Sequence, residues 1–318
     1  MKKLKKGTKI FLMIICLILV CCVTAVTVGY KYMNRLKVVQ LNLGTATTEK
    51  EIKEKLNVLE ETEKKSIEHN IENILILGID NKENASDTIM VLSIDKGTKS
   101  LKLTSIMRDL YVDLPGDADK INYAYNIGGV EYTISTLNKL FNLDIQKYIK
   151  INFEGFVNII DYLGGLELNI TEAERSIMND KLVIDGVYDE DKVTKSGDVL
   201  LNGHQALAYS RVRIIDSDFV RTQRMRNIMM GVFEKIKGES VIKYPKIISD
   251  LSSNVTTNIE TMDMLNMGKF MISVDSNNIK QFRVPIDGTT VDSDTNGVYN
   301  LKWNVEENIN AFHNFIYN

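Results

Sequence analysis

One segment near the N-terminus constrains the topology of this chain more than any other. Residues Ile10 to Gly29 carry no charged side chain and are rich in Leu, Ile, Val and Cys. A helix of about 20 apolar residues covers the ~30 Å hydrocarbon core of a bilayer. The residues before it include five lysines, Lys2, Lys3, Lys5, Lys6 and Lys9. Because such positive charge stays on the cytoplasmic side, we expect a cytoplasmic tail at 1–9, a single transmembrane helix at 10–30 and an extracellular remainder.

A cleaved signal peptide is the alternative, since Val23-Thr24-Ala25 loosely resembles a small-residue cleavage site. The apolar run is longer than the ~7 to 15 residues of a usual signal core, which favours an uncleaved anchor in the cell membrane. The three cysteines, Cys16, Cys21 and Cys22, all lie inside this run. The sequence therefore predicts neither a disulfide framework nor a cysteine metal site in the outer part.

The rest of the chain is long enough for one ordinary domain with appendages, because the whole chain has 318 residues. Its formal net charge of −3 is nearly balanced, and neither a helix-turn-helix signature nor a continuous basic stripe is present. Nucleic acid is therefore not an expected partner.

The segment from Thr48 to Asn70 is crowded with Glu and Lys. Its apolar residues Ile52, Leu56 and Leu59 recur at helical spacing, which predicts a solvated helix. We interpret residues 31–70 as an extracellular stalk.

Beyond the stalk, short strand patterns alternate with helical ones. Strands are expected at Asn73–Gly78, Thr88–Ile94, Ser100–Met107 and Tyr148–Phe153, and helices at Val130–Phe141, Phe156–Leu163 and from Asp218 to about Gly238. This alternation predicts an α/β domain, at 71–240, in which helices cover a sheet. The extension 241–318, with a strand-like Lys280–Pro285 and a helical Val305–Phe315, is expected to pack on this core.

The stretch from Tyr209 to Arg226 is unusually rich in arginine. It contains Arg211, Arg213, Arg221, Arg224 and Arg226. On an extended segment the first two would share a face, and Arg221 and Arg224 would be neighbours near the positive end of the following helix. Arginine forks with free helical N–H groups suit phosphate oxygens. A solvated basic face, balanced by Asp216 and Asp218, is the alternative.

Two aspartates end or open expected strands, and either could hold a hard cation. Asp80 closes the first strand and Asp87 opens the second, while Arg108 follows the third. Mg²⁺ commonly takes one or two carboxylates together with substrate phosphates, although a lone aspartate is more often a turn or cap residue. The three histidines, His69, His204 and His313, show no pairing with a nucleophile, so a zinc site or serine triad is not expected.

These features belong to an ordered set of motifs. They are Gly78-Ile79-Asp80, Ser86-Asp87-Thr88-Ile89, Ile106-Met107-Arg108-Asp109, Lys120-Ile121-Asn122-Tyr123-Ala124, Asp161-Tyr162-Leu163-Gly164-Gly165 and the block from Leu201-Asn202-Gly203 to Arg224. In this order, over roughly residues 73–237, the chain resembles the LytR-CpsA-Psr family. The resemblance implies a central mixed β-sheet flanked by α-helices, with an apolar tunnel for a lipid.

The resemblance also implies an activity. Such proteins transfer a glycopolymer, such as a teichoic acid or capsular polysaccharide, from a polyprenyl diphosphate carrier to a peptidoglycan hydroxyl. The matching pyrophosphate-binding residues here are Arg108, Arg211, Arg213, Arg221 and Arg224, with Arg108, Arg211 and Arg213 as the catalytic group and Asp80 and Asp87 as Mg²⁺ ligands. Expected partners are the lipid-linked polymer, peptidoglycan and the bilayer.

Two positions depart from the family pattern. Ala85 stands where an arginine is common, and Met225 stands where a glutamine is common. Each change removes a polar contact near the phosphates. Two other functions therefore stay open: a non-catalytic polyprenyl-phosphate-binding regulator, and a pyrophosphatase that hydrolyses the lipid diphosphate.

Overall fold

The computed structural model describes residues 38–80, 85–116, 119–184, 191–212, 218–240, 243–295 and 297–318. Within these ranges, none of the helices combines the length and apolar character needed to cross a bilayer. The expected tail and transmembrane helix, at 1–9 and 10–30, lie outside the described residues, as does Arg213.

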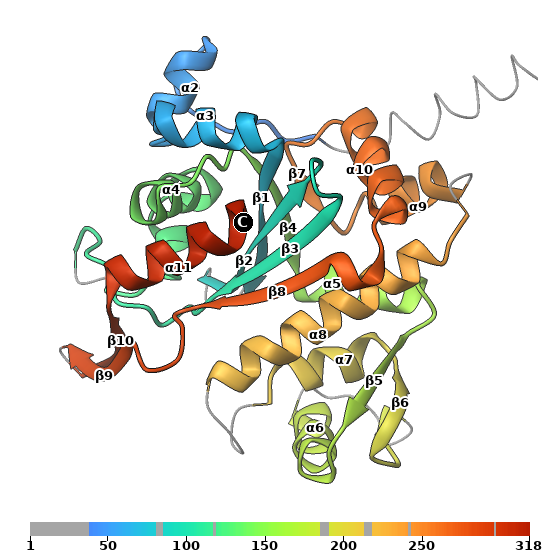
Figure 1. Ribbon diagram of the computed structural model, residues 1–318. Helices are drawn as coiled ribbons and strands as arrows, with labels where there is room; N and C mark the ends of the chain where they lie inside the picture. The colour runs from blue at the N-terminus through green and yellow to red at the C-terminus, as the bar shows by residue number, and fades with distance from the viewer. Residues whose placement is uncertain are drawn as a thin grey trace, which may run out of the picture.

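The centre of the molecule is a six-stranded mixed sheet with the strand order β7-β4-β1-β2-β3-β8 (Figure 1). The strands are β1 (Ile71–Asp80), β2 (Ala85–Asp95), β3 (Ser100–Ile106), β4 (Lys147–Asn152), β7 (Thr256–Thr257) and β8 (Ile279–Val284). Strands β1, β2 and β3 form an antiparallel meander, and β4 and β8 pair in parallel with its two outer strands. The expected mixed sheet is confirmed, and its four predicted core strands are present.

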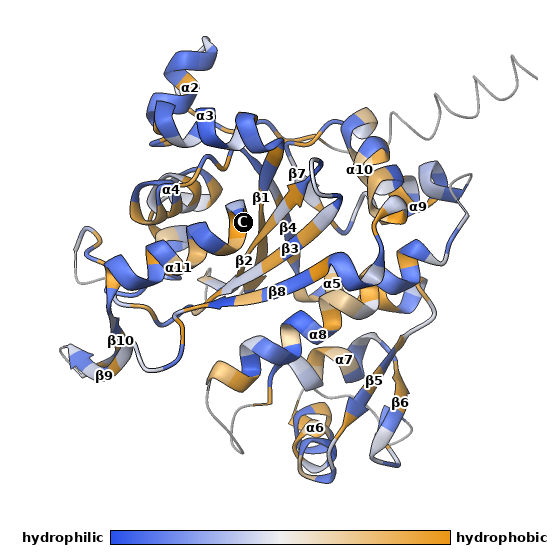
Figure 2. Ribbon diagram, in the orientation of Figure 1, coloured by the Kyte–Doolittle hydropathy of each residue, from blue (hydrophilic) through white to orange (hydrophobic). Residues whose placement is uncertain are grey.

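Both faces of the sheet are buried, which explains why its central strands read as nearly continuous apolar runs. In β1, Leu75 and Leu77 belong to one hydrophobic cluster, whereas Ile74 and Ile76 belong to another. Successive side chains of a strand point to opposite faces, so a single run supplies both clusters. Figure 2 shows these strands largely in the colours of hydrophobic residues.

The first face, which we call the filled face, is covered by α4 (Tyr123–Phe141) and α11 (Val305–Tyr317). Helix α4 is kinked at Gly128 and Gly129, where the backbone leaves the helical region and Gly129 has φ of 65°. Only the part after the kink shows the regular apolar spacing expected from the sequence. Aromatic rings dominate the packing here, with Phe141 5.4 Å from Trp303 and 5.6 Å from Phe312 between centroids.

The second face, which we call the cavity face, is covered by α8 (Asp218–Lys237), α9 (Tyr244–Leu251) and α10 (Thr261–Ser273). Methionines are prominent in its hydrophobic cluster; they are Met90, Met225, Met229, Met230, Met264, Met267 and Met271. Helix α8 thus lies between the sheet and a third group of elements.

That third group forms a small unit with its own hydrophobic cluster. It comprises α5 (Phe153–Tyr162), α6 (Glu172–Ile184), α7 (Gly203–Ser210) and a two-stranded sheet of β5 (Leu166–Ile170) and β6 (Gly197–Leu201). In Figure 1, α6, α7, β5 and β6 lie on the far side of α8 from the sheet, whereas α5 directly follows β4.

The expected single stalk helix is instead two, α2 (Glu49–Lys55) and α3 (Glu60–His69). The break follows from Asn57, which has a positive φ of 53° and donates its side-chain amide to Ser135 Oγ at 2.7 Å. Leu56, beside it, is fully buried in the cluster of the filled face. This part of the stalk therefore packs against the domain, although its charged surface is solvated as expected.

The C-terminal extension completes the core as well as packing on it. Its β8 and β7 form the two edges of the sheet, and its α10 and α11 cover opposite faces. The remaining elements are a short 3₁₀ helix, η3 (Ser276–Asn278), and a hairpin of β9 (Thr290–Thr295) and β10 (Val298–Trp303). One sheet contains strands from both sides of residue 240. The expected division there, between a catalytic domain and an extension, stays a prediction.

Candidate functional site

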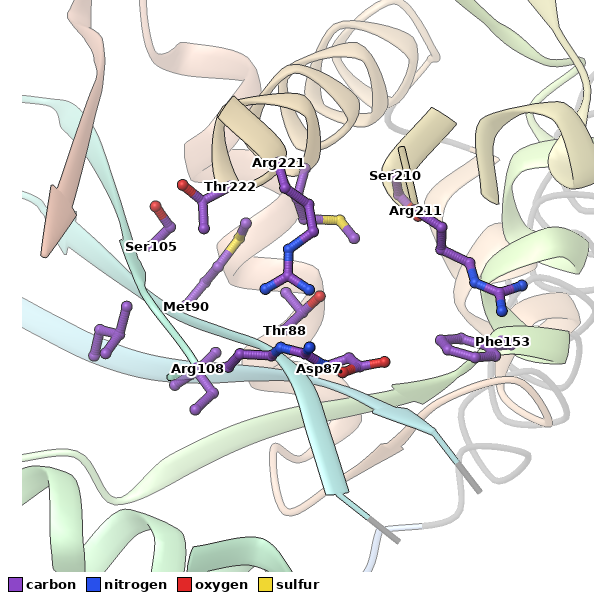
Figure 3. Close-up of a pocket in the computed structure, with 13 residues that line it drawn as sticks. Asp87, Thr88, Met90, Ser105, Arg108, Phe153, Ser210, Arg211, Arg221 and Thr222 are labelled. Carbon is purple, nitrogen blue, oxygen red and sulfur yellow. Dashed lines mark hydrogen bonds and ion pairs between the residues drawn. The ribbon is translucent and has the colours of Figure 1, made fainter. Parts of the chain in front are cut away.

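A cavity opens where the ends of β2 and β3 meet α5, α7 and α8 (Figure 3); its empty space, including the part open to solvent, is about 510 Å³. It is lined by Asp87, Thr88, Ile89, Met90, Ser105, Ile106, Arg108, Phe153, Ser210, Arg211, Arg221, Thr222 and Met225. Asp87 and Arg108 therefore share one cavity with Arg211 and Arg221, which lie more than 100 residues further along the chain. We call this the anion cavity.

Arg108 is fixed by carboxylates on two sides. Its Nη1 donates to Asp87 Oδ1, and its Nε donates to Asp109 Oδ2 at 3.3 Å. Lys120 Nζ lies 3.2 Å from the other oxygen of Asp109. The Arg108 side chain is 15% exposed, so it faces the cavity while its geometry is held by charge-assisted hydrogen bonds.

Arg211 is held by the packing of α7. Asn202 caps this helix by accepting from Gln205 N at 2.9 Å, and Asp161 accepts from Gly203 N at 2.7 Å. A side chain at Gly203 would lie 2.3 Å from the backbone oxygen of Val157, so only glycine permits this close approach of α5 and α7. The motifs around Asp161 and Gly203 thus fix the start of α7 against α5, and this position of the helix determines where Arg211 lies at its other end.

Arg211 itself is the C-cap residue of α7, with φ of −102° and ψ of 3°. The extended segment that would align it with Arg213 is therefore not observed at this position. Its guanidinium lies over the ring of Phe153, 5.4 Å from the centroid, which is a cation–π arrangement.

Arg221 stands in the first turn of α8, where the helix dipole is positive, and is 7% exposed. Figure 3 shows its guanidinium directed toward Arg108 and Asp87, with Arg211 set to one side above Phe153. The expected arrangement of Arg108, Arg211 and Arg221 around one space is thus observed. Their role in binding pyrophosphate stays a prediction.

Arg224 is not among the described residues that line the anion cavity. It is 2% exposed, and its Nε donates to Glu174 Oε1 on α6 at 2.7 Å. Burial raises the pKa of Glu174, but hydrogen bonds from Thr171 and Arg224 outweigh it, so the pKa lies below its ordinary value. Arg224 also donates to Val212 O at 3.0 Å. It therefore reaches the site through the backbone next to Arg211.

The two candidate metal ligands lie at the same end of adjacent strands. Asp80 is the last residue of β1 and pairs with Ala85 of β2, two residues before Asp87. Ala85 is buried, 3% exposed. Among the described residues, no group of three or more His, Cys, Asp or Glu side chains could hold a metal by itself. Asp87 lines the anion cavity, whereas Asp80 is not among the described residues that line it. Mg²⁺ commonly takes one or two carboxylates and completes its shell with phosphate oxygens and water.

A second, apolar cavity lies on the cavity face, between the sheet and helices α8, α9 and α10; its empty space, including the part open to solvent, is about 1150 Å³. Helix α8 contributes Met229, Val232, Phe233 and Ile236 to its wall. The same helix lines the anion cavity with Arg221, Thr222 and Met225. Met225 also packs in the hydrophobic cluster of the cavity face, so it lies between the two spaces.

The sequence motifs did not indicate several of the lining residues. Phe153, Ser105 and Thr222 lie on the cavity wall, yet each belongs to an ordinary strand or helix pattern. The one available signal is helical spacing: Arg221 and Met225, like Thr222 and Arg226, are four residues apart and therefore lie on the same face of a helix.

A comparison with protein-family models agrees with this geometry. The model of the LytR_cpsA_psr family matches residues 39–313. The chain belongs to this family. The match covers both cavities and most of the C-terminal extension, which is consistent with a sheet that needs β7 and β8 at its edges.

Relatives within the LytR_cpsA_psr family include two curated proteins named polyisoprenyl-teichoic acid–peptidoglycan teichoic acid transferase TagU. The chain is 35% identical to that of Bacillus anthracis over 204 residues, which is 62% of this chain and 63% of the relative. It is 31% identical to that of Enterococcus faecalis over 273 residues, or 82% of each protein. The first match thus spans under two thirds of its relative.

Solved structures of similar proteins have the same fold. The crystal structure of TagT from Bacillus subtilis has a TM-score of 0.63 and 26% identity, covering 77% of this chain and 91% of that one. A structure described as TagT bound to LIIa-WTA has a TM-score of 0.65 and 26% identity, again covering 77% of this chain and 91% of that one.

Proposed function

We propose that this protein is a phosphotransferase of cell wall assembly. It moves a glycopolymer, of the teichoic acid or capsular polysaccharide type, from a polyprenyl diphosphate carrier to a peptidoglycan hydroxyl. One observation carries the proposal: a single helix, α8, lines a cationic cavity at its start and a large apolar cavity further along. The names of the TagU relatives support the same reaction.

The two cavities match the two halves of a lipid diphosphate. Arg221 and Met229 are eight residues apart on α8, which corresponds to about 12 Å along a helix. A diphosphate beside Arg221 would therefore have its first isoprene units beside Met229. Burial of each methylene stabilises such a complex by ~0.8 kcal/mol, and the arginines add charge-assisted hydrogen bonds.

The reaction needs no covalent enzyme intermediate. The acceptor hydroxyl oxygen attacks the phosphorus next to the glycopolymer and loses its proton, while the bond from that phosphorus to the bridging oxygen breaks. A phosphodiester forms and polyprenyl phosphate leaves. Phosphoryl transfer depends mainly on positioning and on stabilising charge, which we assign to Arg108, Arg211, Arg213 and Arg221. Arg224 supports Arg211 through Val212 O.

Magnesium is the cofactor that we propose, with Asp80 and Asp87 as its protein ligands. When bound, Mg²⁺ would neutralise negative charge on the phosphate oxygens. Asp87 already accepts from Arg108, so the same carboxylate would orient the arginine and the ion. Two carboxylates are too few to hold a metal alone, so Mg²⁺ would bind together with the diphosphate substrate.

We also propose that residues 10–30 anchor the protein in the cell membrane, with 1–9 in the cytoplasm and the domain outside. Val39 N donates to Thr257 O at 2.8 Å, so the described chain begins at the β7 edge of the sheet. Eight residues separate Gly29 from Val38, and they span at most about 30 Å. The apolar cavity, whose wall includes Val255 next to β7, would thus lie close to the lipid donor.

The test uses the full chain in detergent micelles with a short polyprenyl diphosphate glycan, Mg²⁺ and peptidoglycan oligomers. Mass spectrometry should detect a phosphodiester adduct and released polyprenyl phosphate. Arg108→Ala should lower the rate by ~10³-fold, because it removes a cation that stabilises developing charge. Chelation of Mg²⁺ should lower it as well. The exposed-site variant Lys50→Ala should retain the full rate.

Other outcomes would identify the alternatives. Free glycan phosphate without any adduct would indicate a pyrophosphatase. Tight binding of polyprenyl phosphate with no turnover of several donors would indicate a non-catalytic regulator. Either result would overturn the transferase proposal.

A further inference from the structure

Arg226, on α8, is a buried arginine that the reaction described above does not use. It is 5% exposed. Its Nη1 donates to Ser105 Oγ of β3 and lies 3.5 Å from Thr222 Oγ1, one turn earlier on α8. Its Nη2 donates to Gln223 Oε1, and its Nε is buried without a hydrogen-bond partner.

The charge of Arg226 is not balanced by a carboxylate among the described residues. All of its hydrogen-bond partners are neutral. Burial, and secondarily the cation Arg283 on β8, lower the pKa of Arg226 to about 10. The side chain is therefore still protonated at neutral pH, although its surroundings disfavour the charge.

The charge of the neighbouring Arg224, in contrast, is balanced by a carboxylate. Arg224 is also deeply buried, but Glu174 on α6 pairs with it at 2.7 Å. A buried charge without a partner is costly, and an apolar residue at position 226 would avoid that cost. The unbalanced charge at Arg226 therefore needs a reason other than stability.

The position of Arg226 next to the anion cavity gives a reason to keep this charge. Ser105 and Thr222, the two hydroxyl residues that it contacts, both line the anion cavity. Arg226 thus lies directly behind the part of the wall that Ser105 and Thr222 form. The Ser105 hydroxyl donates to Phe282 O at 3.5 Å and the Thr222 hydroxyl donates to Phe219 O at 2.8 Å. Both hydroxyl oxygens also accept from Arg226, so this part of the wall is held in one arrangement. Charges separated by buried protein are also screened less than charges in water.

We propose that Arg226 is a positioning residue of the anion cavity, which orients Ser105 and Thr222 and adds an unpaired positive charge that a bound diphosphate balances. This inference rests on the proposed function, since it requires an anionic ligand in that cavity. It assigns part of the affinity for phosphate to a side chain that does not touch it.

The proposal predicts opposite effects on binding and on stability. Arg226→Met keeps the unbranched stem and removes the charge. Calorimetry with the full chain in detergent micelles and inorganic pyrophosphate should show about tenfold weaker binding, as expected for the loss of one partly screened charge nearby. The melting temperature without ligand should stay unchanged or rise, because a buried unpaired charge is removed.

Three further variants separate charge from packing. Arg226→Lys keeps the charge and should bind within about threefold of the wild type, whereas Arg226→Gln should resemble Arg226→Met. Arg224→Met removes one partner of a buried pair and should lower the melting temperature sharply. Lys50→Met, on the exposed surface of α2, controls for the change in net charge and should alter neither quantity.

Distinct outcomes would overturn the inference. If Arg226→Met lowers the melting temperature and leaves pyrophosphate binding unchanged, Arg226 is only structural. If Arg226→Met does not fold, equal binding by Arg226→Lys and Arg226→Gln leads to the same conclusion. If the wild type itself does not bind pyrophosphate, the anion cavity of the proposed function fails, and this inference fails with it.

Discussion

The two faces of the central sheet receive the same kind of residue from the strands and different kinds from the helices. On the filled face, the ring centroid of Phe141 lies 5.4 Å from that of Trp303 and 5.6 Å from that of Phe312. On the cavity face, flexible methionines such as Met229 and Met267 line the apolar cavity. Rigid rings interlock and exclude volume, whereas thioether chains adapt to a variable occupant. The difference supports the proposal that one face stabilises the domain and the other binds the lipid.

The sharpest test of this contrast is the loss of a large side chain from each face. Phe312→Ala should lower the free energy of unfolding by ~3–5 kcal/mol, because a fully buried ring is removed and its site cannot collapse. Chemical denaturation followed by the fluorescence of the single tryptophan, Trp303, measures this directly, since Trp303 packs beside Phe141. The matched variant on the cavity face, Met267→Ala, should cost only ~1 kcal/mol, because its side chain already borders open space. Equal costs would contradict the distinction between the faces.

Sequence periodicity predicted many of the elements but not this contrast. Strong apolar patterns correctly predicted β1 to β4 and the helices α5 and α8, and the part of α4 after its kink. They also predicted a strand near Lys280, but not that β8 would pair with β3 at the edge of the sheet. Pairing between segments about 180 residues apart depends on the whole fold. The apolar pattern of one strand does not show which strand it will pair with.

The candidate site shows the same limit. Ordered motifs correctly brought Asp87, Arg108, Arg211 and Arg221 to one cavity. They did not distinguish Arg221 from Arg224, three residues later on α8, because helical spacing alone makes the two neighbours. The packing of α6 decides the matter, since it brings Glu174 to Arg224. An apolar space was expected only from the family resemblance. Periodicity could not predict it, because its walls come from the sheet and from α8, α9 and α10 together.

A second test adds volume where the cavity face leaves space. Met229→Trp would place a large ring between the anion cavity and the apolar cavity. Binding of polyprenyl phosphate should weaken by about a hundredfold, which corresponds to the lost burial of a few methylenes at ~0.8 kcal/mol each. The free energy of unfolding should change by less than ~1 kcal/mol, since the ring enters existing space. Titration of the full chain in micelles measures the affinity.

Inorganic pyrophosphate provides the control for this variant. It has no lipid chain, so Met229→Trp should leave its binding unchanged. Equal weakening for pyrophosphate and polyprenyl phosphate would mean that the substitution disturbs Arg221 rather than the path of the chain. A corresponding enlargement on the filled face, Leu137→Trp, should instead destabilise the protein, because the fully buried Leu137 has no adjoining space.

The smallest expected effect concerns a carboxylate beside the filled face. Asp144 accepts from Asn73 Nδ2 at 2.7 Å. Burial raises the pKa of Asp144 above its ordinary value of 3.8, and hydrogen bonds from Asn73 and Ser66 offset only part of this. A carboxyl whose pKa is raised by folding contributes stability that is fully present below the unfolded pKa and is lost as the pH rises through the folded pKa. At neutral pH the charged group therefore opposes folding.

Asp144→Asn should raise the melting temperature at pH 7 by about 1–2 °C, because an amide oxygen can still accept from Asn73 without a charge. The advantage should vanish as the pH falls below 3.8, where the wild-type carboxyl is neutral in both states. Thermal scans of both proteins between acidic and neutral pH measure this difference. A constant difference at every pH would show that packing, not ionisation, distinguishes the two side chains.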